Sequence, residues 1–207
     1  MTEQRIDKNL PYLLELAREV EKEHGRGVEA HVVDGIVMMS PMEPVHFRTQ
    51  DQINDQLKQQ VEAGWTVLGE SEFAHPTWDR KRTPDLYVWD GDEEDNMPFD
   101  PEHIGFVIEV VSRSSVENDY IHKPRAYAGV GIDAYLILDP YTRAWTLMTD
   151  PGPSGYRERA TGAYGKTLVV AAGDREYQVV TEGLPEAKLW QQIEAWPVHR
   201  TDPHAAS

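Results

Sequence analysis

Three residues in the middle of the chain, Asp85, Glu109 and Lys123, have the types and the spacing that metal-dependent chemistry requires. Asp85 opens the apolar segment Leu86 to Trp89, and Glu109 interrupts the apolar run Gly105 to Val111. A buried, ionised carboxylate loses several kcal/mol of hydration unless a cation compensates it. Two carboxylates brought together raise one pKa strongly unless a divalent ion neutralises them. Oxygen ligands suit Mg²⁺ or Mn²⁺, so the pair predicts a site for one of these ions.

The lysine has two interpretations, and both stay open at the level of sequence. Asp119, Lys123 and Tyr127 lie four residues apart, so on a helix they share one face. Lys123 can then reach the strand that carries Glu109 and act there as the partner that orients or deprotonates a water. Alternatively, Lys123 forms an i,i+4 salt bridge with Asp119 that supports the helix by a few tenths of a kcal/mol. Glu109 can likewise be a structural ion-pair partner.

Other residues near these positions are weaker candidates. The backbone carbonyl of Val110 is a candidate further metal ligand. Ser112 either hydrogen-bonds near the site or ends the strand and begins a turn. Lys81 is the reserve candidate for the catalytic lysine. Glu43 and His46 precede or begin a predicted helix, and the sequence assigns a role to neither.

The net charge limits what the protein can bind at long range. The chain has 36 acidic and 20 basic residues, so its formal charge is -16. A surface this acidic repels phosphates, and any contact with nucleic acid must therefore be local. The candidate contacts are Arg80, Lys81 and Arg82, with Arg113 as a further one. The other interpretation of this basic cluster is a solvated loop.

Composition excludes several classes of protein. The 207 residues include no cysteine, which excludes disulfides, thiolate zinc sites and a Cys nucleophile. The N-terminal residues lack the apolar run of a signal peptide, and no segment reaches the roughly 18 apolar residues of a membrane span. We therefore expect a cytoplasmic protein that does not enter a membrane, with one domain over residues 1–196 and a disordered tail over residues 197–207.

Hydrophobic periodicity and turn signals predict a mixed α/β fold. Helices are expected at four places: Leu10 to Glu23, Val45 to Ala63, Ser114 or Ser115 to Ala128, and Pro185 to Ala195. Asp34-Gly35 predicts a hairpin turn between two strands. The expected strands are Val28 to Val33, Ile36 to Met39, Trp65 to Leu68 with an extension to Phe73, Leu86 to Trp89, Gly105 to Val111, Ala134 to Leu138, Ala144 to Met148, Leu168 to Ala171 and Tyr177 to Val180. The uniformly apolar segment that carries Glu109 predicts the central strand.

Taken in order, several motifs resemble one family, the Uma-two group of restriction-endonuclease-like proteins of cyanobacteria and actinobacteria. The resemblance covers most of the chain. Its motifs are the hairpin and Pro-rich turn before His46, Thr83-Pro84-Asp85, Val107 to Ser112, Asp119, Lys123, Tyr127, Gly129-Val130, Ala134 to Leu136 and Leu138-Asp139-Pro140.

The resemblance implies the PD-(D/E)XK nuclease fold, a mixed sheet flanked by helices that holds two acidic ligands and a lysine around Mg²⁺. Asp85 and Glu109 would be those ligands. In the wider superfamily the lysine follows the second acid by two residues, where this chain has Val111. The family's lysine on the following helix matches Lys123. Pro124 should kink or split that helix, because a proline inside a helix removes a hydrogen bond.

The functional expectation is hydrolysis of nucleic-acid phosphodiester bonds by a Mg²⁺-activated water, with DNA favoured over RNA as the substrate. Cleavage of a duplex needs two sites and so favours a homodimer. Two alternatives stay open. One is a catalytically silent, acidic module that binds a protein partner, because a fold does not determine a function. The other is a phosphodiesterase that acts on a small nucleotide.

Overall fold

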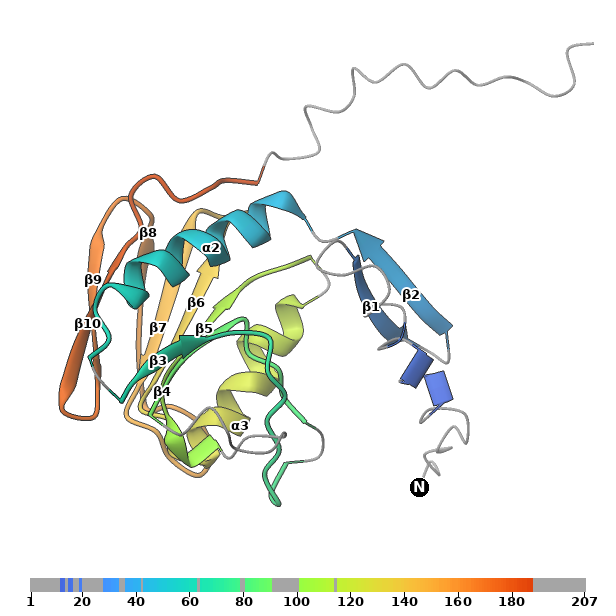
Figure 1. Ribbon diagram of the computed structural model, residues 1–207, viewed down its shortest axis with the longest axis horizontal. Helices are drawn as coiled ribbons and strands as arrows, with labels where there is room; N and C mark the ends of the chain where they lie inside the picture. Colours follow the sequence, from blue (N-terminus) through green and yellow to red (C-terminus); the bar gives the residue numbers. More distant parts are fainter. Residues whose placement is uncertain are drawn as a thin grey trace, which may run out of the picture.

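Figure 1 shows the computed structural model of the chain. It describes residues 12, 13, 15, 16, 19, 28–33, 36–41, 43–62, 64–78, 81–90, 101–113 and 115–187, and it describes only the backbone of residues 28–33, 36, 38–41 and 102. Within these ranges no helix is both long enough and apolar enough to cross a membrane.

The centre of the fold is a six-stranded mixed sheet with the strand order β3-β4-β5-β6-β7-β8. β5 and β6 are parallel, and every other neighbouring pair is antiparallel. The strands are β3 (Thr66–Leu68), β4 (Leu86–Trp89), β5 (Ile104–Val110), β6 (Ala134–Asp139), β7 (Ala144–Thr149) and β8 (Glu158–Ala163). The segment between β5 and β6 crosses over the sheet, as a parallel connection requires.

Two hairpins accompany this sheet. β1 (Val28–Val33) pairs with β2 (Ile36–Pro41), and Figure 1 places this hairpin beyond the first turn of α2. β9 (Thr167–Ala172) pairs with β10 (Arg175–Val180). Gly173 begins the tight turn of the second hairpin with φ +62°, a conformation that glycine adopts without strain.

Helical segments cover both faces of the sheet (Figure 1). α2 (Pro44–Lys58) lies on one face, with the β9–β10 hairpin beside it. A 3₁₀ turn, η2 (Pro101–His103), leads into β5. The other face is covered by the crossover, which consists of a π-helical turn, η3 (Asn118–His122), followed by α3 (Lys123–Gly129).

The two covered faces form two separate apolar cores, because side chains alternate along each strand. Phe106, Ile108 and Val110 of β5 pack with α2 and the β9–β10 hairpin. Val107 points to the opposite face, where Tyr127 of α3 packs. By the same alternation Glu109 belongs to the α3 face. The central strands are buried on both sides, which explains their continuous apolar sequence.

The expected mixed α/β architecture is confirmed, and most of the expected strands form within one or two residues of their predicted bounds. The predicted extension from Leu68 to Phe73 is wrong, because β3 ends at Leu68 and Phe73 makes only an isolated bridge to Arg82. β8 was not predicted. Its sequence ERATGA has no apolar alternation, and it is a strand because it pairs with β7 along the sheet edge.

Two predicted helices fall largely outside the described residues. Of the helix expected from Leu10 to Glu23, the five described residues 12, 13, 15, 16 and 19 are helical. Of the helix expected from Pro185 to Ala195, residues 185–187 are described and are not helical. The turn at Asp34-Gly35 and the tail from residue 197 also lie outside the described part, so the tail stays a prediction, as does the single domain over residues 1–196.

Two neighbouring valines of β9 test the packing of the β9–β10 hairpin on the sheet. Val170 is 0% exposed and Val169 is 55% exposed. We expect Val170→Ala to lower the free energy of unfolding by about 1.5–3 kcal/mol, because it removes buried methyl groups and leaves a cavity. Val169→Ala should change it by less than about 0.5 kcal/mol. Urea denaturation followed by circular dichroism measures both, and equal effects would contradict this packing.

Candidate metal centre

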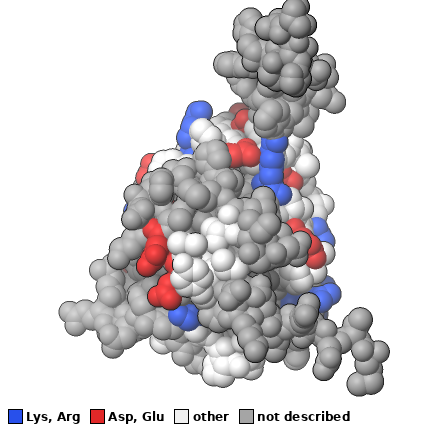
Figure 2. All heavy atoms as spheres, turned by 90° about the vertical axis from the view of Figure 1, so that its right-hand side faces the viewer, with Lys and Arg blue, Asp and Glu red and all other residues white. Residues whose placement is uncertain are grey.

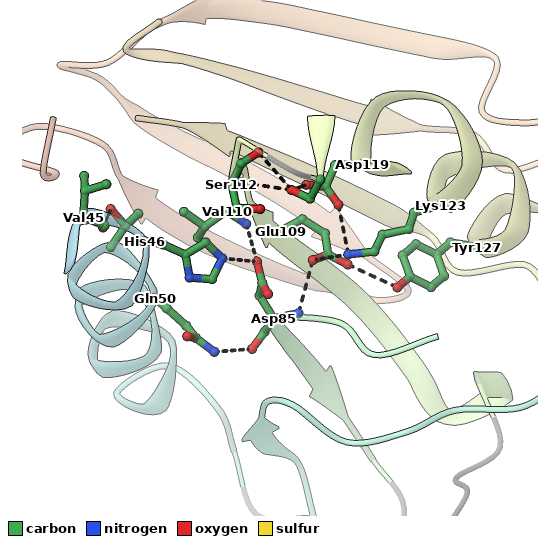
Figure 3. Close-up of polar contacts among 12 residues, drawn as sticks. Val45, His46, Gln50, Asp85, Glu109, Val110, Ser112, Asp119, Lys123 and Tyr127 are labelled. Atoms are coloured by element: carbon green, nitrogen blue, oxygen red, sulfur yellow. Dashed lines mark hydrogen bonds and ion pairs between the residues drawn. The ribbon is translucent and has the colours of Figure 1, made fainter. Parts of the chain in front are cut away.

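β4 and β5 bring the two predicted carboxylates to the same end of the sheet. The strands are antiparallel, with Leu86 opposite Ile108. Asp85 directly precedes Leu86 and Glu109 directly follows Ile108, so the two residues become neighbours. The backbone N–H of Asp85 donates to Glu109 Oε2 at 3.3 Å. Figure 3 shows both side chains at this strand end, between α2 and α3.

Lys123 joins Glu109 and Asp119 in a buried ion triad (Figure 3). Its Nζ lies 2.8 Å from Glu109 Oε2 and 2.9 Å from Asp119 Oδ1. All three side chains are buried, and Glu109 is 0% exposed. The same ammonium group therefore forms the i,i+4 pair with Asp119 and reaches Glu109 on the strand, whereas its action on a water stays a prediction.

A π-helical turn before α3 lets the chain accommodate Pro124 without breaking a helical hydrogen bond. The N–H of Lys123 bonds to the carbonyl of Asn118, five residues back, rather than four as in an α-helix. Pro124 then stands in the first turn of α3, where its missing N–H is tolerated. The expected break at Pro124 is present as a change of helix type, and it places Asp119 and Lys123 on the side of the sheet that carries Glu109. π-turns of this kind are frequent at functional sites.

Hydroxyl groups complete the surroundings of the acids. Tyr127 donates to Glu109 Oε1 at 3.2 Å. Ser115 donates to the carboxylate of Asp119, and Tyr135 donates to the backbone carbonyl of Asp119 at 2.9 Å. The N–H of Ser112 donates to Ser115 Oγ at 3.0 Å, which is the turn-forming role that the sequence left open for Ser112. Each acid is therefore held by hydrogen bonds as well as by charge.

Burial and neighbouring charges set the protonation of this triad. Burial raises the pKa of Glu109 well above its usual range, although Lys123 opposes the shift. Burial also raises the pKa of Asp119. Burial lowers the pKa of Lys123, but Glu109, Asp119 and Asp85 outweigh it and leave that pKa raised. Lys123 is thus a protonated ammonium group at neutral pH, a donor rather than an acceptor of protons.

Asp85 differs from the other two acids in the direction of its pKa shift and in its partial exposure to solvent. Burial raises its pKa, but His46, Lys123 and the N–H of Val110 outweigh burial and lower that pKa below its usual value. The N–H of Val110 donates to Asp85 Oδ2 at 2.7 Å. The side chain of Asp85 is 21% exposed. It is therefore the acid through which solvent or a ligand reaches the site.

Sequence reasoning left two contacts of Asp85 unassigned. His46 Nε2 lies 3.1 Å from Asp85 Oδ2, and the side-chain amide of Gln50 donates to the Asp85 carbonyl at 2.7 Å. A signal for both was present, because His46, Gln50, Ile53 and Leu57 form one stripe at helical spacing. Polar residues that continue an apolar stripe face the protein interior and need partners there.

The donor set fits a magnesium ion that keeps most of its own waters. Among the described residues, no group of three or more His, Asp or Glu side chains is arranged to hold a metal ion. Mg²⁺ is, however, usually bound by one or two carboxylates together with waters and substrate phosphates. Asp85 and Glu109 supply two such carboxylates, and that of Asp85 is partly exposed. The carbonyl of Val110 stays a predicted ligand.

The predicted basic contacts are dispersed. Arg80 lies outside the described residues. Lys81 is exposed and pairs with Glu72, whereas Arg82 is buried beside Phe73. Arg113 follows Ser112, is exposed, and pairs with Glu43 at 3.2 Å. In Figure 2 acidic and basic side chains are interspersed over the described part of the visible face.

Comparisons with known proteins bear on this site. The model of the Uma2 family, whose description is "Putative restriction endonuclease", matches residues 13–178. One similar solved structure is described as the "crystal structure of a putative nuclease belonging to DUF820 from Anabaena variabilis ATCC 29413". It is 15% identical, with a TM-score of 0.48, over 72% of this chain and 87% of that chain, which is too weak a likeness to carry an argument. No curated protein matches.

The buried triad predicts an unequal response to the loss of two lysines. Lys123→Met should lower the free energy of unfolding by about 3–5 kcal/mol, because it leaves Glu109 and Asp119 buried without their countercharge. Lys81→Met removes an exposed pair with Glu72 and should cost at most about 1 kcal/mol. Urea denaturation at pH 7 compares the two variants. Equal costs would mean that Lys123 does not compensate a buried charge.

Proposed function

The chain belongs to the Uma2 family, and from that membership and the site we propose that it is a Mg²⁺-dependent endonuclease. The observation that carries the proposal is the contact of Lys123 with Glu109 beside Asp85. Two acids and a lysine at the end of paired strands are the set that the PD-(D/E)XK resemblance implies. A structural ion pair alone explains Lys123 and Glu109, but it does not explain Asp85, whose pKa is lowered and whose side chain is partly exposed beside them.

Mg²⁺ held by Asp85 and Glu109 would polarise the scissile phosphate and lower the pKa of a bound water. The chain's own residues have separate tasks. Asp85 binds through an oxygen that is already negative. Lys123 holds its ammonium group toward Glu109 and orients the attacking water or the phosphate by donating hydrogen bonds. Its raised pKa favours this role over removal of the water's proton.

Two further groups support that arrangement. Tyr127 stays a phenol, because burial and the charge of Glu109 raise its pKa well above the usual value, and it donates to Glu109. Asp119 forms the second ion pair of Lys123. We assign both as positioning residues, since both are buried and contact other members of the site.

The proposed substrate is nucleic acid, with DNA favoured over RNA. The net charge of -16 repels phosphates at long range, so binding must depend on nearby cations. Arg113 is the best placed, because it follows the strand that carries Glu109 and its side chain is exposed. Lys81 is a second candidate. Cleavage of both strands of a duplex would need two sites, and we therefore propose a homodimer.

The net charge also supports the second candidate function, an acidic module that binds a protein partner without catalysis. Such a module has no need of an ionised carboxylate beside a buried acid. A small-nucleotide phosphodiesterase would use the same residues and would need less positive surface. A test of metal binding distinguishes the protein-binding module from the two enzymes. The preferred substrate then distinguishes the endonuclease from the small-nucleotide phosphodiesterase.

Metal binding is the first prediction of the proposal. We expect Mn²⁺ and Mg²⁺ to bind the wild type in calorimetric titrations, and we expect Asp85→Asn and Glu109→Gln each to weaken binding at least about 10-fold, because each removes a ligand charge. Asp90→Asn is the control, since Asp90 is an exposed acid paired with His103 at the other end of β5. A folded wild type that binds neither ion at millimolar concentration would exclude the proposed mechanism.

Cleavage is the second prediction of the proposal. With Mg²⁺ present, the wild type should cut plasmid DNA, single-stranded DNA or RNA, and the preferred substrate is read from the initial rates. Lys123→Met should lower kcat by about 100-fold or more, because the water or phosphate loses its hydrogen-bond donor. Lys81→Met should leave kcat unchanged and affect only binding. Metal binding without cleavage of any nucleic acid would favour the small-nucleotide enzyme.

A further inference from the structure

The first two turns of α2 contact Asp85 at two points. His46 Nε2 donates to the carboxylate oxygen Oδ2 at 3.1 Å, and Gln50 Nε2 donates to the backbone carbonyl of the same residue at 2.7 Å. His46 and Gln50 are four residues apart on one face of the helix, and both are buried. Figure 3 shows the two side chains pointing from α2 to Asp85.

The contacts of Asp85 distinguish its two carboxylate oxygens. Oδ2 accepts hydrogen bonds from His46 and from the N–H of Val110, at 3.1 and 2.7 Å. Within the described part of the chain, Oδ1 accepts no hydrogen bond, and the side chain is 21% exposed. A carboxylate oxygen with two donors is engaged with the protein. The other oxygen is the one available to a ligand.

The backbone carbonyl of Asp85 also has close neighbours. A Cβ added to Gly69 would lie 2.4 Å from the Asp85 carbonyl oxygen, so only glycine allows this approach. The carbonyl therefore lies close to Gly69 and accepts the hydrogen bond of the Gln50 amide. α2 is itself anchored in the core by Ile53 and Leu57, each 0% exposed, so its contacts with Asp85 come from a rigid element.

We propose that His46 and Gln50 are positioning residues that α2 supplies to the metal centre: together they hold Asp85 so that Oδ2 faces the protein and Oδ1 is left to bind a divalent cation. This inference rests on the proposed function, since it assigns how one of the two ligand carboxylates is oriented. Hydrogen-bonded neighbours of a ligand reduce its freedom before the metal arrives, and their loss typically costs about 10–100-fold in metal affinity.

The experiment compares three single variants by calorimetric titration with Mn²⁺ alone. His46→Leu fills a similar volume without a donor and should weaken Mn²⁺ binding about 10–100-fold. His46→Gln keeps an N–H donor and should lie closer to the wild type. His103→Gln is the matched control, because His103 also contacts a carboxylate, Asp90, at 3.1 Å, but is exposed at the other end of β5. Circular dichroism establishes that each variant is folded.

A second measurement needs no metal. The N–H of Val110 donates to Asp85 Oδ2, so its hydrogen-exchange protection in NMR spectra reports whether the carboxylate stays in place. We expect protection to fall in His46→Leu and to persist in His46→Gln and His103→Gln. If His46→Leu does not fold, Gln50→Met takes its place, because it removes the donor to the Asp85 carbonyl. Its Mn²⁺ affinity and the hydrogen-exchange protection of its Val110 N–H are then measured.

The outcomes separate this inference from the proposed function. Unchanged Mn²⁺ affinity and unchanged Val110 protection in a folded His46→Leu variant would overturn the inference while leaving the metal centre intact. A wild type that binds no Mn²⁺, together with loss of Val110 protection in His46→Leu, would overturn the proposed function. It would still support the role of His46 in holding the Asp85 carboxylate. Weaker Mn²⁺ binding with lower protection supports both.

Discussion

The structure around β5 depends on the burial of one charge, that of Glu109. The residue is 0% exposed on the central strand of the sheet, where an isolated carboxylate would be strongly destabilising. Lys123 and Tyr127 of α3 and the N–H of Asp85, which precedes β4, compensate it from two different segments. Each of those segments must take one particular position for this to occur. The geometry of the whole candidate site follows from that requirement.

The crossover between β5 and β6 illustrates the constraint. An α-helix interrupted by Pro124 would lose a hydrogen bond and would kink. The π-helical turn before Lys123 changes the spacing of the backbone hydrogen bonds, so the proline falls in a first turn and Lys123 still reaches Glu109. The buried ion triad, with Asp119 as its third member, holds the lysine in this position.

The two acids also differ in a way that suits a metal centre. Glu109 is buried and has its raised pKa opposed by one ammonium group, whereas Asp85 has a lowered pKa and meets solvent. Glu109 is thus the fully buried acid of the pair, and Asp85 is the one that meets solvent. Since the overall charge is -16, the proposed reaction would depend on this local arrangement, rather than on the field of the whole molecule, to attract a phosphate with its cation.

The sequence by itself determined the α/β class, most strands, and the pairing of Asp85 and Glu109 with Lys123, because periodicity and a charge in an apolar run are local signals. It could not determine β8, whose polar sequence becomes a strand only by pairing with β7. Nor could it give the π-helical turn at Lys123, or the contacts of His46 and Gln50 with Asp85. Those contacts join residues 35 and 39 positions apart, so only the packing of α2 against the sheet decides them.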